Sequence, residues 1–132
     1  MIRSFFAVLG GMILWAVLWI STNSLVSMVF ADRFTKDPET NEVMSMDPLI
    51  LGLTLTASVL FAVVAGAFTA KTARRREMLH AGILGGIQLA IGVAVQTAYW
   101  GVFPLWYHVL FLGFQVPGYL LGARLLLGRR VV

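Results

Sequence analysis

The fold of this chain is decided by residues 78–123, which read MLHAGILGGIQLAIGVAVQTAYWGVFPLWYHVLFLGFQVPGYLLGA. These 46 residues contain no Asp, Glu, Lys or Arg. A helix that crosses a membrane needs about 20 apolar residues, so the run is long enough for two. Gly101-Val102-Phe103-Pro104 interrupts it near the middle, since Gly followed by Pro favours a chain reversal and Pro can open the next helix. We therefore expect two spanning helices, at about 78–100 and 104–127.

Two shorter charge-free runs precede this segment, 28 residues at 4–31 and 23 residues at 48–70. Each fits one spanning helix, at about 4–29 and 48–70. The first run is longer than the roughly 7–15 apolar residues of a signal peptide, which favours a retained helix. Strands or loops exposed to lipid would leave backbone groups unpaired, so helices are expected. The sequence predicts an all-α membrane protein, one domain over 1–132, with four transmembrane helices and an outer loop at 30–47.

The composition indicates that lipid is the solvent of this chain. Hydrophobic residues make up 59% of the 132 residues and charged residues 12%, whereas soluble domains carry about 25% charge. An ordinary soluble enzyme and a disordered chain are therefore excluded. The absence of cysteine excludes thiol catalysis and thiolate metal sites. The net charge of +4 follows membrane topology, so we expect membrane lipid and no nucleic acid as a partner.

The distribution of Lys and Arg predicts the orientation. The loop at 30–47 holds two bases and five acids, for a net charge of −3. The positive-inside rule places this loop outside and both termini in the cytoplasm. The other eight bases fall on the cytoplasmic side: Arg3, Lys71, Arg74, Arg75, Arg76, Arg124, Arg129 and Arg130.

The first and third predicted helices align without gaps. Leu9-Gly10-Gly11 falls on Leu84-Gly85-Gly86, an offset of 75 residues. The second and fourth helices share a proline near the outer end and small residues before a base. We interpret the chain as two tandem hairpins of the same orientation, related by an axis along the membrane normal, in a compact bundle.

Small residues recur at every fourth position of the predicted helices. In lipid, helices associate through close backbone contact over such residues. The partner is either another helix of the same chain or a second copy, and the stripe on the last helix is the one we expect to remain free for a partner. The predicted packing residues are Ser58, Ala62, Gly66, Gly82, Gly86, Ala90, Gly118 and Gly122.

The helix at 78–100 carries a second face, opposite its small residues. Gln88, Gly92, Gln96 and Trp100 are spaced four apart and lie about 200° from the small stripe. Because both sides hold packing or polar residues, we expect this helix at the centre of the bundle, with little lipid contact. Trp100, Trp106 and Tyr107 are expected at the outer interface as an aromatic belt.

Polar residues inside the spans gather in the outer half. Gln96 and His108 each lie six residues from residue 102, the centre of the predicted turn, and so share one depth. Gln88 and Gln115 lie fourteen and thirteen residues from it. We therefore expect both pairs to form intramembrane hydrogen bonds. Pro117 removes a backbone hydrogen bond and is expected to kink the last helix.

Two interpretations of these polar groups stay open. They can be structural, since an interhelical hydrogen bond contributes about 0.6 kcal/mol. Alternatively they line an outward-facing vestibule formed by Asn23, Thr54, Gln96 and His108.

The sequence predicts no enzyme. The spans contain no Asp, Glu, Lys or Arg, the groups that usually mark ion pathways. The two histidines, His80 and His108, fall at opposite surfaces, so they cannot ligate one metal or haem. We expect no catalytic residue, no metal and no cofactor.

Two segments resemble a known group of proteins. They are Lys71 to Gly86, with Arg-Arg-Glu-Met-Leu-His-Ala-Gly-Ile-Leu-Gly-Gly, and Gln96 to His108, followed by Phe111-Leu112 and Pro117-Gly118. Together they resemble small four-helix bacterial inner-membrane proteins, over about two thirds of the chain. The resemblance implies a bacterial inner-membrane location and implies no activity.

Function follows only in outline from these features. We expect a structural or accessory subunit that binds itself or a larger membrane complex through helix packing. The alternative is a passive carrier or channel for a small neutral solute with an outward vestibule. Few polar residues lie in the inner half, which favours the first.

Topology can be tested with single-cysteine variants, because the chain has no cysteine of its own. A membrane-impermeant maleimide should label Thr40→Cys in intact cells, since 32–46 is predicted outside. It should label Arg75→Cys only after permeabilisation. Labelling of Arg75→Cys in sealed cells would contradict the orientation.

Overall fold

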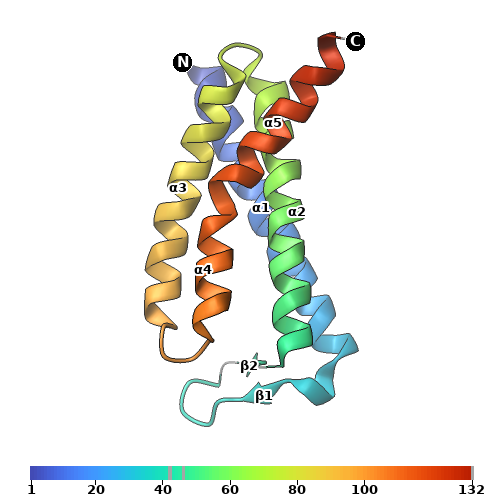
Figure 1. Cartoon of the computed structure of the whole chain (residues 1–132), viewed down its shortest axis with the longest axis vertical. Coiled ribbons are helices and arrows are strands. Elements are labelled where there is room, and N and C mark those ends of the chain that lie inside the picture. Colours follow the sequence, from blue (N-terminus) through green and yellow to red (C-terminus); the bar gives the residue numbers. More distant parts are fainter. Residues whose placement is uncertain (42, 46, 132) are drawn as a thin grey trace.

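The computed structural model describes residues 1–41, 43–45 and 47–131, and within them the four predicted spans are helical (Figure 1). The first three are α1 (Ile2–Val29), α2 (Pro48–Ala73) and α3 (Glu77–Ala98). The fourth is divided into α4 (Leu105–Gly113) and α5 (Gln115–Val131). All four segments are long and apolar enough to cross a membrane, as the charge-free runs predict.

The loop between α1 and α2 is more ordered than the sequence indicates. It contains a 3₁₀ turn, η1 (Ala31–Arg33), and two short strands, β1 (Thr35–Lys36) and β2 (Val43–Met44). The strands pair antiparallel, with Thr35 opposite Met44. Figure 1 shows this hairpin at one end of the bundle, and both termini at the other. We call these the hairpin end and the termini end.

The last span breaks three residues before Pro117. The pyrrolidine nitrogen has no N–H to donate to the carbonyl of Gly113, and its ring crowds the preceding turn. The helix accordingly divides at Phe114, and the N–H of Gly118 bonds the Phe114 carbonyl at 3.0 Å. The predicted kink is confirmed, and it turns α5 across α2 (Figure 1).

The backbones of α2 and α5 approach each other at glycines. A Cβ on Gly66 would collide with the carbonyl oxygen of Tyr119, and one on Gly122 with that of Val63. A Cβ on Gly118 would lie 2.9 Å from the Cβ of Ala62. Gly118 and Gly122 are therefore used within the chain, and the expectation that they remain free for a partner is wrong.

The stripe of small residues that is spaced four apart on α2 faces inward. Ser58, Ala62, Gly66 and Ala70 are buried, because α2 packs against α5, α1 and α3. The central helix is thus α2. The expectation that 78–100 occupies the centre is wrong.

The face that α3 buries is the polar one. Gln88, Gly92 and Gln96 are buried, whereas Gly86 and Ala90 are exposed. A Cβ on Gly86 would meet nothing within 4 Å, and one on Gly82 would touch only Leu120, at 3.8 Å. Amide groups are costly in an apolar medium, which explains why they turn inward while the small stripe faces out. Within the chain, Gly86 and Ala90 do not act as packing residues.

A pair of alanine substitutions tests this packing. Gly122→Ala should lower the free energy of unfolding by about 1–3 kcal/mol, because the methyl group has no space between the two backbones. Gly86→Ala should leave it unchanged or raise it by up to about 1 kcal/mol, because alanine favours a helix. Reversible unfolding of both variants in mixed micelles measures the difference. Equal stability would contradict the α2–α5 contact.

Candidate functional site

A cavity of about 540 Å³ lies in the half of the bundle nearer the hairpin. Its walls come from α1, α3, α4 and the start of α5, with Met44 of β2 at the hairpin side. It is lined by six aromatic side chains, four amide side chains and several aliphatic groups. The aromatic residues are Trp15, Trp19, Tyr99, Phe103, Tyr107 and Phe111, and the amides are Asn23, Gln88, Gln96 and Gln115.

The space exists because α1 contacts the bundle closely only near its start. Ala7 and Gly11 are its buried residues, and Thr69 donates to the Ala7 carbonyl at 3.2 Å. Farther along, the bulky Trp15 and Trp19 replace these small residues. In Figure 1, α1 runs obliquely behind the bundle and ends on the far side of α2 from α3. The cavity occupies the wedge between α1 and the α3–α4 pair.

The tryptophans of α1 form one wall of the cavity. Their rings stack with centroids 5.4 Å apart. Trp15 donates through Nε1 to the carbonyl of Ser58 at 3.3 Å, and Trp19 meets Phe111 edge-on at 5.7 Å. The indole of Trp15 is therefore fixed, and its only donor is used inside the protein.

Gln96 and His108 form the hydrogen bond that the sequence predicts. Nδ1 of His108 bonds the amide of Gln96. The imidazole is fully buried, and it stacks on the ring of Trp100 with centroids 4.6 Å apart. Its Nε2 lies 3.3 Å from the Trp100 carbonyl. His108 thus lies behind Gln96 and holds it, whereas Gln96 itself lines the cavity.

Gln88 and Gln115 do not form the expected hydrogen bond. Both are buried and both line the cavity. Among the described residues, no hydrogen bond joins them and Oε1 of Gln115 has no partner. The break at Phe114 lies between Gln115 and the turn. The number of residues from the turn therefore no longer predicts the depth and direction of Gln115.

The four residues of the predicted vestibule fall into three places. Asn23 and Gln96 line the large cavity. Thr54 lines a neighbouring space of about 100 Å³, which Asn23 and Tyr107 share. The Thr54 hydroxyl donates to the Ile50 carbonyl at 3.0 Å. His108 has no exposed surface.

The aromatic walls were not anticipated as a site. The sequence places Tyr107 in an interfacial belt, but it is buried, with 5% of its surface exposed. Trp100 and Trp106 are exposed at 53% and 43%, as belt residues would be. The sequence pattern that indicates this aromatic wall is the spacing of four residues between Trp15 and Trp19. The small residues recur at the same spacing and are more numerous, so they dominate the pattern.

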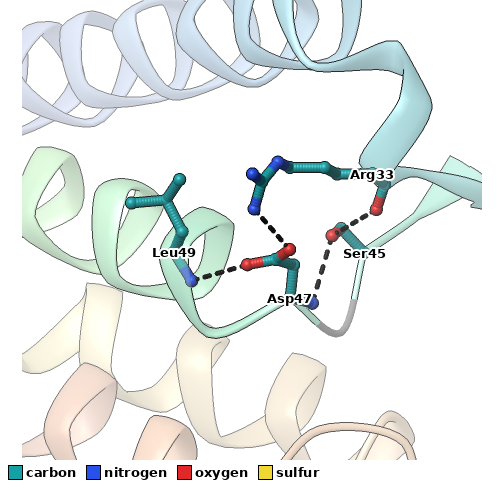
Figure 2. A network of polar contacts seen from close by, with 4 residues as sticks. All are labelled: Arg33, Ser45, Asp47 and Leu49. Atoms are coloured by element: carbon teal, nitrogen blue, oxygen red, sulfur yellow. Dashed lines mark hydrogen bonds and ion pairs between the residues drawn. The ribbon is translucent and has the colours of Figure 1, made fainter.

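A network of polar contacts holds the hairpin against α2 (Figure 2). Arg33 pairs with Asp47 at 2.7 Å, and Ser45 donates to the Arg33 carbonyl at 2.6 Å. Asp47 also caps α2, accepting from the N–H of Leu49 at 2.9 Å. Chiefly this N–H, and also the Arg33 guanidinium, hold the pKa of the Asp47 carboxyl below its usual value. The network fixes the strand that carries Met44 beside the cavity.

The lining of the cavity combines amide groups with aromatic rings. Among the described residues that line it, none is Asp, Glu, Lys, Arg or His, and no group of three metal-ligating side chains gathers in the described part of the chain. Amide groups and aromatic rings offer hydrogen bonds and flat apolar surface. Comparison with protein-family models, curated proteins and solved structures gives no match to this chain.

Proposed function

We propose that this protein is a multi-pass membrane protein that binds a small uncharged molecule in the cavity between α1, α3 and α4. The location we propose is a bacterial inner membrane, with both termini in the cytoplasm and the hairpin end outside. The cavity volume of about 540 Å³ falls within the range of about 300–1,000 Å³ for ligand sites. A lining without formal charge favours a neutral ligand, because a buried unpaired charge is strongly disfavoured.

The observation that carries this proposal is the amide of Gln115. The residue lines the cavity and is 4% exposed, yet its Oε1 has no hydrogen-bond partner. Leaving such a group unpaired costs about 1–3 kcal/mol, so buried amides are normally satisfied. Oε1 is enclosed by protein atoms in this conformation, so a half-turn about the last side-chain torsion, which exchanges the oxygen with the amide nitrogen, would be needed for it to meet a ligand. A polar molecule in the cavity would remove this cost.

Binding or slow carriage is favoured over an open channel. The termini half of the bundle is closed by side-chain contacts at Gly11 and backbone contacts at Gly66 and Gly122, where even a methyl group would collide. The cavity therefore supports a vestibule on one side of the membrane, as the neutral-solute alternative requires. It offers no continuous polar path.

Tryptophan quenching tests whether the cavity is accessible. In a background of Trp100→Phe and Trp106→Phe, only the cavity residues Trp15 and Trp19 remain fluorescent. Acrylamide, a small neutral amide, should quench them in nanodiscs. Val95→Phe fills the cavity wall and should lower the Stern–Volmer constant at least about twofold, whereas Val93→Phe, exposed and outside the lining, should not. Equal and weak quenching in all three proteins would contradict an accessible site.

A second candidate is the structural or accessory role. Its supporting observation is the outward face of α3, where Gly86, Ala90, Ala94 and Ala98 are all exposed. Small side chains give lipid little contact, whereas they allow a second helix to approach closely. We propose this face, in place of Gly118 and Gly122, as the surface for a second copy or a larger complex.

Two glycines with open surroundings provide the test of this second role. A Cβ on either Gly86 or Gly52 meets nothing within 4 Å, so both accept a larger side chain without internal collision. Gly86→Leu should reduce the oligomer mass measured by native mass spectrometry, and Gly52→Leu should not. A mass unchanged by Gly86→Leu would remove this face from consideration.

A further inference from the structure

The orientation of one amide follows from the two contacts of His108. Nδ1 contacts Oε1 of Gln96, and Nε2 lies 3.3 Å from the carbonyl oxygen of Trp100. Both partners are acceptors, whereas a neutral imidazole donates from one nitrogen and accepts at the other. For the neutral ring, one of the two contacts must therefore be made by a donor of the partner residue.

Only one arrangement of the neutral ring satisfies both contacts. The Trp100 carbonyl belongs to the backbone and can only accept, so Nε2 donates to it. Nδ1 then accepts, and the amide of Gln96 must present its nitrogen to it. The two amide positions exchange by a half-turn about the last torsion, and their assignment follows from the hydrogen bonds. This arrangement leaves the Gln96 oxygen to face the cavity.

The same polarity appears on the opposite wall. Asn23 uses one N–H of its side-chain amide to donate to the Trp19 carbonyl at 2.9 Å, and its oxygen is available to accept from a ligand. Trp15 donates to the Ser58 carbonyl. The indole N–H of Trp15 and one N–H of Asn23 are thus used within the protein, whereas the oxygens of Asn23 and Gln96 are left to accept.

We infer that the cavity takes a flat, uncharged ring compound that donates hydrogen bonds, of the indole or phenol class. This inference rests on the proposed binding function and names its ligand class. The ring is expected in the cavity against the rings of Tyr107 and Phe111, whose centroids lie 5.9 Å apart, because aromatic walls favour flat apolar bodies. The N–H or O–H group of the ligand bonds the amide oxygen of Gln96 or Asn23.

A matched pair of probes tests the hydrogen-bond polarity directly. We would titrate the full-length protein in nanodiscs with 5-fluoroindole, which has one N–H, and with 5-fluoro-1-methylindole, which has none. Binding is followed by ¹⁹F NMR, and empty nanodiscs give the lipid partition to subtract. The N–H probe should bind about 3- to 10-fold more tightly, the effect of one net hydrogen bond.

Variants assign this preference to the amide. Gln96→Leu should bring the ratio of the two affinities towards one, while Thr97→Val, exposed on the neighbouring position, should preserve it. Asn23→Leu provides the same test on the opposite wall if Gln96→Leu does not fold. The comparison of the two probes on the unmodified protein needs no variant at all.

The outcomes separate this inference from the proposed function. Equal binding of the two probes, or tighter binding of the methylated one, would overturn the donor preference and leave the cavity as a binding site. Binding of neither probe, with acrylamide still reaching Trp15 and Trp19, would overturn the ligand class alone. Binding of neither probe together with unquenched tryptophans would overturn both.

Discussion

Two glycines bring the backbones of α2 and α5 into contact, and the arrangement of the other helices depends on this contact. Gly66 lies against the carbonyl of Tyr119, and Gly122 against that of Val63. In the proposed membrane location, helices that are apolar all round gain little from hydrophobic burial against one another, so close packing must hold them together. α1 and α3 attach to this central pair, mainly through α2 and α5 respectively.

The tight packing in the termini half of the bundle explains the cavity in the half nearer the hairpin. Small residues of α1 fit against α2 near the termini end, and Gly11 lies so close to Thr69 that a Cβ would collide with its hydroxyl. Trp15 and Trp19 then hold α1 away from α3. The inward-facing amides of α3 need polar surroundings, which the wedge supplies. The cavity is thus a consequence of a helix that changes from small to large side chains along one face.

The break at Phe114 has a similar double effect. It turns α5 so that its glycines lie along α2, and it moves Gln115 out of register with Gln88. His108, on the hairpin side of the break, keeps its register with Gln96. The same proline that directs the close contact of α2 and α5 therefore leaves one buried amide oxygen without a partner.

The sequence by itself determined four long apolar helical segments, because charge is sparse in such segments whatever surrounds them. The predicted 48–70 is Pro48–Ala73 and the predicted 78–100 is Glu77–Ala98, whereas the predicted 104–127 is divided into α4 and α5. It also determined the Gln96–His108 pair, because equal distance from a tight turn fixes equal depth. Tertiary structure decided which face of α3 is buried, since two faces were chemically suited and the packing of α2 and α5 selected one. It also decided the aromatic walls, because the crossing angle of α1 depends on side chains that lie far apart in the sequence.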